Sequence, residues 1–176
     1  MKIGIIADVH AEPEKLRAVL DALDDVDLLL CAGDLTGYGK YPNEVIEIIR
    51  AMDIPTVKGN HDSPSSDITP ENADFLRNLP LEWSETIDGV RLYMCHGIPG
   101  VPFIGVTPKH FDEVRLISML ESVHADIMIA GHTHQSLLVE LSGSRRFINP
   151  GAVCLGSYAV LSLPSCELTI KQLDDK

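Results

Sequence analysis

The sequence predicts an α/β fold, which some schemes would class as α+β, with parallel and antiparallel strand pairing. Through the first half, apolar strand-like runs alternate with amphipathic helical stretches, the pattern of parallel strands joined by helices. Asp88-Gly89 then separates two strand-like runs and predicts a tight hairpin. The last third holds only short strand-like runs between Ser-Gly, Asn-Pro-Gly and Leu-Pro-Ser turns. We therefore expect mixed sheets covered by helices.

The individual elements follow from apolar periodicity and from proline position. Strands are expected at residues 3–7, 28–31, 55–58, 82–87, 90–95, 127–130, 137–141, 145–148, 157–163 and 167–173. Helices are expected to begin at Pro13, near Pro42, at Pro70 behind a Thr69 cap, and at Thr107-Pro108, because proline suits the first helical turn. The last helix should present Phe111, Val114, Ile117 and Leu120 on one face.

Length and charge limit the organisation and the partners of the protein. The chain has 176 residues, no repeat and no linker, so residues 1–176 are expected to form a single domain. Its net charge of -12 argues against nucleic acid as a partner and against anionic membrane, since phosphate would be repelled. No apolar run has the length of a signal peptide or a membrane span, and the expected location is the cytoplasm. The four cysteines are expected to be reduced packing residues.

Potential metal ligands gather in five short clusters, each directly after a strand-like run. The clusters are Asp8-x-His10, Gly33-Asp34, Gly59-Asn60-His61-Asp62, His96 and Gly131-His132-Thr133-His134. Because open α/β sheets bind ligands at the carboxyl ends of their strands, we expect these side chains to meet along one sheet edge. His110 and His124 stand outside the clusters and are interpreted as ordinary surface or core histidines.

The residue types in the clusters favour transition-metal chemistry. They supply imidazole, carboxylate and amide groups without a thiolate, which suits manganese, iron, zinc, nickel or cobalt better than a sulfur-rich structural zinc site. Side chains two apart in a strand share a side, so Asp8 with His10, and His132 with His134, can each point two ligands into one site. Glycine before Asp34, Asn60 and His132 allows a sharp turn or a close approach to an ion.

In their order, these motifs resemble the signature of the calcineurin-like metallophosphoesterase superfamily: Asp-x-His, Gly-Asp, Gly-Asn-His-Asp/Glu, a later histidine and Gly-His-x-His. The resemblance spans residues 3 to about 155. It implies a four-layer αββα sandwich of two mixed β-sheets flanked by helices. The short chain and the Asn149-Pro150-Gly151 turn look most like the small single-domain phosphodiesterase branch.

The resemblance also implies roles for individual residues. It gives one divalent metal to Asp8, His10 and His134, the other to Asn60, His96 and His132, and makes Asp34 the bridge. It implies hydrolysis by a hydroxide that bridges the two metals, with His61, Asp34 and Asn60 as catalytic residues and His61 assisting the leaving group. Manganese is the metal expected to support activity in an assay. Two divalent cations would attract phosphate despite the acidic surface.

One departure from the family pattern narrows the substrate. Serine/threonine phosphatases extend the second motif to Gly-Asp-x-Val-Asp-Arg-Gly, whereas residues 33–39 read Gly-Asp-Leu-Thr-Gly-Tyr-Gly. The expected substrate is therefore a small-molecule phosphodiester, and Tyr38 and Lys40 stay open as substrate contacts. Two alternatives also stay open: hydrolysis of a dinucleoside polyphosphate or other phosphoanhydride, and a non-catalytic scaffold of the retromer-subunit type. A homo-oligomer is a further open possibility.

Overall fold

The two β-sheets pack face to face between helices. The computed structural model describes residues 1–109 and 111–174. Its elements are β1 (Lys2–Ile6), α1 (Pro13–Asp21), β2 (Leu28–Cys31), α2 (Pro42–Ala51), α3 (Pro70–Asn78), β3 (Glu82–Ile87), β4 (Val90–Cys95), α4 (Glu113–Ser122), β5 (Ile127–Ile129), β6 (Leu137–Glu140), β7 (Arg146–Asn149), β8 (Ser157–Ser162) and β9 (Glu167–Gln172), with 3-10 turns η1 (Ser142–Ser144) and η2 (Val153–Leu155).

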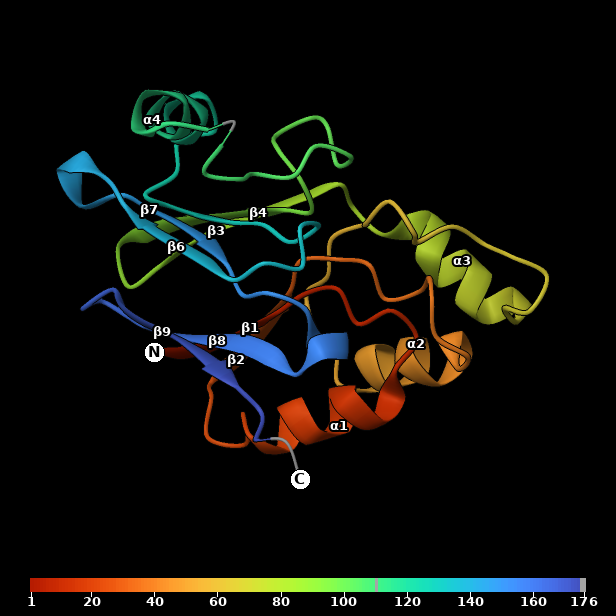
Figure 1. The fold of residues 1–176 in the computed structure, drawn as a ribbon. Coiled ribbons are helices and arrows are strands. Elements are labelled where there is room, and N and C mark those ends of the chain that lie inside the picture. The colour runs from red at the N-terminus through yellow and green to blue at the C-terminus, as the bar shows by residue number, and fades with distance from the viewer. Residues whose placement is uncertain (110, 175–176) are drawn as a thin grey trace.

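Each sheet mixes parallel and antiparallel neighbours, as the sequence predicts. The first sheet has the order β2-β1-β8-β9 and the second the order β3-β4-β5-β7-β6. β1 pairs parallel with β2 and antiparallel with β8, while β4 pairs antiparallel with β3 and parallel with β5. Figure 1 shows the layers in order: α4, the five-stranded sheet, the four-stranded sheet, then α1 and α2, with α3 beside α2. The αββα sandwich is confirmed.

Alternation along the strands divides the core into three layers. In β4, Leu92 and Met94 point between the sheets, whereas Tyr93 and Cys95 pack with Leu116 of α4. The layer between the sheets also holds apolar side chains of β1, and the third layer joins the outer face of the first sheet to α1, α2 and α3. A strand buried on both faces reads as a continuous apolar run, which explains the sequence pattern.

Two of the expected elements differ. Residues 55–58 form no strand but a single parallel bridge between Cys31 and Thr56. The helix expected at Thr107-Pro108 begins only at Glu113, because the Asp112 side chain caps it by accepting from the Arg115 N–H at 2.9 Å. Leu116 and Leu120 face the second sheet, so Val114 points outward, where it is 76% exposed.

Other local predictions are confirmed. Pro13, Pro42 and Pro70 each begin a helix, and the Thr69 side chain accepts from the Asn72 N–H. Asp88 and Gly89 both have positive φ, 49° and 81°, as a type I′ hairpin turn requires. The four cysteines are free. His110 lies outside the described residues.

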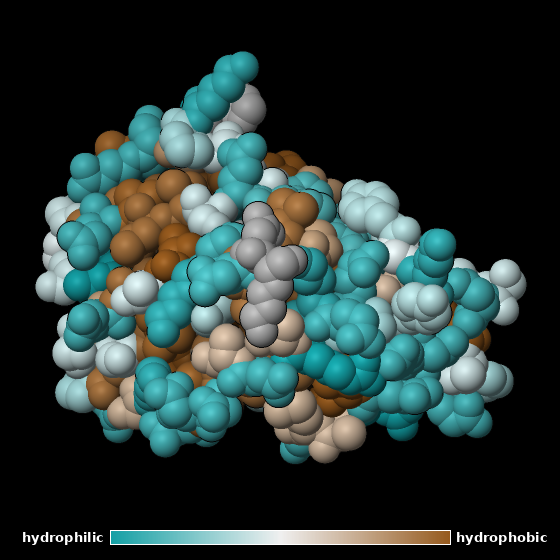
Figure 2. Space-filling view, turned by 60° about the horizontal axis from the view of Figure 1, so that its bottom comes forward, coloured by the Kyte–Doolittle hydropathy of each residue, from teal (hydrophilic) through white to brown (hydrophobic). Residues whose placement is uncertain are grey.

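Much of the face shown in Figure 2 is hydrophilic, with hydrophobic residues gathered on the side where β6 and β9 lie in Figure 1. Both strands are sheet edges, so side chains such as Leu168 and Ile170 of β9 are only partly buried. Within the described residues, none of the helices has the length and apolarity needed to cross a membrane.

Candidate metal centre

The clusters converge, but at the ends of two sheets rather than along the edge of one. Asp8 follows β1 and Asp34 follows β2 in the first sheet, whereas His96 follows β4 and His132 follows β5 in the second. Loop contacts bind the two ends together: the His132 N–H donates to both Asp8 carboxylate oxygens, at 3.1 and 3.2 Å. The parallel β1–β2 and β4–β5 pairs thus present their carboxyl ends to a shared site.

Asp34 stands at the centre of this site. Its Oδ2 lies 3.7 Å from His10 Nε2 and 3.2 Å from His96 Nε2. Asp8, His10 and His134 form one group whose ligand atoms lie within 4.8 Å of one another, and Asp8, Asp34 and His96 form a second such group. The structure therefore brings these five predicted ligands together around one carboxylate.

Asn60 and His132 are the two remaining predicted ligands, and Asn60 contacts both His132 and His96. The Asn60 Oδ1 lies 3.1 Å from His96 Nε2 and 2.6 Å from His132 Nδ1. All seven residues named as metal ligands from the sequence are thus gathered around Asp34.

Backbone carbonyls set which imidazole nitrogen faces the site. His10 Nδ1 lies 3.0 Å from the Thr36 carbonyl oxygen, and His96 Nδ1 lies 2.7 Å from the Ala32 carbonyl oxygen. A carbonyl can only accept, so each Nδ1 carries a proton, and the neutral form of each ring has its lone pair on the Nε2 that faces the site. Histidines that bind metals usually donate their other ring N–H to a carbonyl or carboxylate in this way, which fixes the orientation of the ring.

The electrostatics of the centre fit a bound cation. Burial raises the pKa of Asp8 to about 7, although the charge of His96 counteracts it. Burial also lowers the pKa of His10 to about 4, which keeps its imidazole neutral as metal ligation requires. Burial acts to raise the pKa of Asp34, but the hydrogen bond and charge of His96 outweigh it and lower that pKa. Burial acts to lower the pKa of His96, but the hydrogen bond and charge of Asp34 outweigh it and raise that pKa. Imidazoles and buried carboxylates in this arrangement match a divalent transition metal.

Local backbone strain accompanies the gathering of ligands. Residues with side chains seldom adopt positive φ, yet the ligands Asp8, His10, Asp34, His132 and His134 all have φ between 50° and 72°. Such strain persists only where surrounding contacts hold it, and it concentrates at functional sites. Gly59 is required for a different reason: a Cβ there would lie 2.1 Å from Asp34 Oδ1.

Asp62 was not assigned a role from the sequence, although it closes the Gly59-Asn60-His61-Asp62 cluster. It is fully buried, and its carboxylate accepts four backbone N–H groups, from Asp34, Leu35, Thr36 and Gly59, at 2.8–3.1 Å. Burial raises the pKa of Asp62, while the donors from Gly59 and Thr36 counteract this. Asp62 thereby fastens the loop of Asp34 to the loop of Asn60.

Replacing Asp62 by asparagine is expected to lower the free energy of unfolding by about 3 kcal/mol. The amide retains one acceptor oxygen and turns an NH₂ group toward buried N–H donors. Urea unfolding of metal-free protein measures the effect. The matched control is Asp27→Asn, because the exposed Asp27 carboxylate accepts a single backbone N–H, from Lys2. Equal losses in the two variants would contradict the role of Asp62.

His61 lies beside the centre rather than in it. Its backbone N–H donates to Asp34 Oδ1 at 2.8 Å, and its ring nitrogen Nε2 lies 3.1 Å from the Tyr38 hydroxyl. The His61 ring also borders a hollow of about 220 Å³ between the loop of Gly37 and the segment 63–68. His61 is thus fixed next to Asp34 without belonging to either group of ligands.

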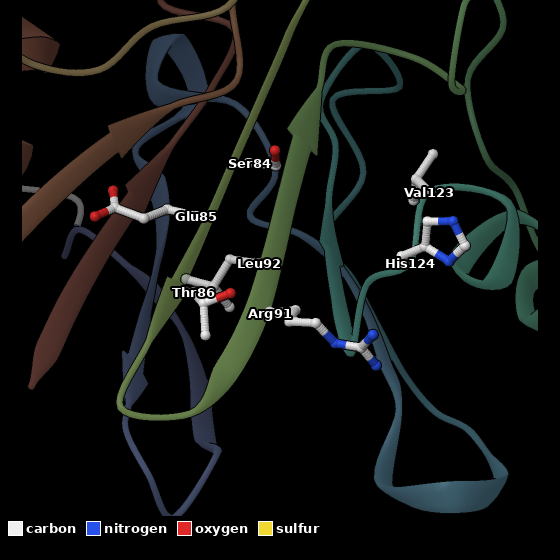
Figure 3. Close-up of a pocket in the computed structure, with 7 residues that line it drawn as sticks. All are labelled: Ser84, Glu85, Thr86, Arg91, Leu92, Val123 and His124. Carbon is white, nitrogen blue, oxygen red and sulfur yellow. The ribbon is translucent and has the colours of Figure 1, made fainter.

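A larger hollow, of about 350 Å³, lies along β3 and β4 near the end of α4. Figure 3 shows Arg91 and His124 on one side of it and Glu85 pointing the other way. Asp126 already binds the Arg91 guanidinium through two oxygens, at 2.8 and 3.0 Å. The lining residues of this hollow therefore present no convergent set of reactive groups, and the metal centre remains the candidate site.

Fold and side chains together define a metal-binding centre at the strand ends of a two-sheet sandwich. Residues 1–165 match the calcineurin-like phosphoesterase superfamily domain, and the chain belongs to this superfamily. The chain is 32% identical over 156 residues to a probable metallophosphoesterase of Methanothermobacter thermautotrophicus, covering 86% of this chain and 77% of the relative.

Two further relatives agree with this assignment. A phosphodiesterase of Methanocaldococcus jannaschii is 27% identical over 165 residues, covering 88% of this chain and 85% of the relative. The crystal structure of a metallophosphoesterase from Sphaerobacter thermophilus superposes with a TM-score of 0.81 at 25% identity, covering 100% of this chain and 90% of the other. The chain is thus a metallophosphoesterase, a hydrolase of phosphate esters.

Proposed function

We propose that the protein hydrolyses small phosphodiesters with two divalent transition-metal ions, and that His61 assists the leaving group. The observation that carries this proposal is the position of Asp34, whose Oδ2 lies 3.7 Å from His10 Nε2 and 3.2 Å from His96 Nε2. A carboxylate so placed can bridge two cations, and paired cations are the usual device for in-line displacement at phosphorus.

The gathered residues divide into two ligand sets. Asp8, His10 and His134 would hold one ion, Asn60, His96 and His132 the other, and Asp34 both. Bound there, the ions would lower the pKa of a water and neutralise phosphoryl oxygens. The donor set suits manganese, which we propose as the metal for assays.

The protein's own side chains orient the reaction. The His61 backbone N–H fixes its residue to Asp34, and His61 lines the hollow described above. A protonated imidazole at this place can give its proton to the departing oxygen, and the leaving group would then extend into the hollow.

The lining of that hollow favours an uncharged leaving group. Ser63, Ser65 and Asp67 supply hydroxyls and a carboxylate, and neither lysine nor arginine is among its lining residues. A polyphosphate leaving group would meet negative charge without a compensating cation, whereas the alcohol of a phosphodiester would find hydrogen-bond partners. This observation supports a small diester over a dinucleoside polyphosphate.

The test measures the rates at which manganese-loaded protein hydrolyses three substrates, each against a chelator control. The substrates are bis(p-nitrophenyl) phosphate, p-nitrophenyl phosphate and diadenosine tetraphosphate. We expect diester hydrolysis to be the fastest and the chelator to remove it. Faster cleavage of the tetraphosphate would support the phosphoanhydride alternative. If none of the three substrates were hydrolysed in a metal-dependent way, a non-catalytic scaffold would be favoured instead. A scaffold would not need the complete set of metal ligands that this chain carries.

A further inference from the structure

Tyr38 lies against the metal centre and His61 at the same time. Its hydroxyl is 3.1 Å from His61 Nε2, and its ring centroid is 4.9 Å from that of His61 and 4.5 Å from that of His10. The side chain is nevertheless 72% exposed. An exposed tyrosine seldom holds such contacts by chance, because ordering it costs side-chain entropy.

The glycines on either side of Tyr38 bring it there. Gly37 has φ +134°, and a Cβ on it would lie 2.5 Å from His10 Nδ1. The Gly39 N–H donates to the His10 carbonyl oxygen at 2.9 Å, and a Cβ on Gly39 would lie 2.4 Å from that oxygen. Only glycine allows the loop to pack this closely on the His10 backbone, so Tyr38 is held over the centre.

The contact with Tyr38 determines how the His61 ring can be used. The Tyr38 hydroxyl lies within hydrogen-bond reach of Nε2 of that ring. A protonated His61 has two N–H donors; with Nε2–H donated to the Tyr38 oxygen, Nδ1–H is left for a departing substrate oxygen. The hydrogen bond to Tyr38 also keeps the His61 ring from flipping, which would exchange the positions of Nδ1 and Nε2.

We propose that Tyr38 is a positioning residue for His61, a role that rests on the proposed function of His61 at the leaving group. Tyr38 stands where the phosphatase motif Gly-Asp-x-Val-Asp-Arg-Gly carries arginine.

A double-mutant cycle tests the proposal. Tyr38→Phe keeps the ring and removes only the hydroxyl, and it should lower kcat about 10-fold with unchanged KM and metal content. In a His61→Asn background the same change should alter kcat less than about 2-fold, because the group through which Tyr38 acts is gone. Tyr41→Phe is the matched control, an exposed tyrosine three residues away. An equal loss in both backgrounds, or none in wild-type background, would overturn the proposal.

A readout besides activity separates this proposal from the function itself. In zinc-loaded protein, the ¹⁵N shifts of the His61 ring should report a hydrogen-bonded Nε2 and a single orientation in the wild type. Tyr38→Phe should shift them toward averaged values. Unchanged ring shifts would overturn the positioning role even in an active enzyme, whereas changed shifts in a protein without hydrolytic activity would refute only the proposed function.

Discussion

Asp34→Asn is expected to reduce metal-stimulated hydrolysis by about 10³-fold or more. The substitution keeps the shape and one acceptor oxygen but removes the negative charge that stands between the two ligand groups, 3.2 Å from His96 Nε2 and 3.7 Å from His10 Nε2. Without that charge, two cations would repel each other across the site. Metal content at fixed free manganese should accordingly fall below two ions per chain.

Asp74→Asn provides the control for this experiment. Asp74 lies on α3 with 71% of its side chain exposed, paired with Arg77, so the variant makes the same charge change away from the centre. Its activity and metal content should equal those of the wild type. An Asp34→Asn protein that keeps two tightly bound ions and more than a tenth of the activity would remove Asp34 from the bridging position.

His61→Asn is expected to lower kcat by about 10²–10⁴-fold while both metals stay bound. The ring belongs to neither of the two ligand groups, so its loss leaves the ion sites intact. Asparagine retains a polar side chain but cannot supply a proton to the departing oxygen. The loss should therefore grow as the leaving alcohol becomes less acidic, which a series of aryl and alkyl diesters measures.

The matched histidine control is His124→Asn, in the hollow along β3 and β4. Asparagine tolerates the positive φ of 54° at that position, so the backbone is not strained by the change. Wild-type kinetics are expected. If His61→Asn lost activity only together with its metals, the residue would serve ion binding and the assignment to the leaving group would be wrong.

Prediction from the sequence succeeded where a local pattern has a single structural solution. At Thr69-Pro70 the cap, the proline and the helical pattern that follows agree on one helix start, and Asp88-Gly89 favours a tight turn. It failed where two signals competed in one segment. Thr107-Pro108 and Asp112 both resemble helix starts, and the Asp112 cap prevails; packing of Leu116 and Leu120 against the second sheet then leaves Val114 outside.

The short strand expected at residues 55–58 shows a second kind of failure. The β-propensity of these residues favours a strand. Whether the segment pairs with β2 depends on how far the chain runs beside β2 before it turns toward the metal centre. The Lys58 N–H donates instead to the Pro80 carbonyl oxygen, so the segment leaves the sheet after one bridge. No local residue pattern encodes that distant partner.

The sequence alone determined the chemistry of this protein: which donor groups it carries, their order, and their place directly after apolar runs. Only the tertiary structure decided that the strand ends belong to two sheets, that Asp34 lies between two groups of ligands, and that Asp62 and Tyr38 support them. The physical reason is that residue type and periodicity are local properties. A hydrogen bond such as that between Tyr38 and His61 exists only after loops from different strands have been packed together.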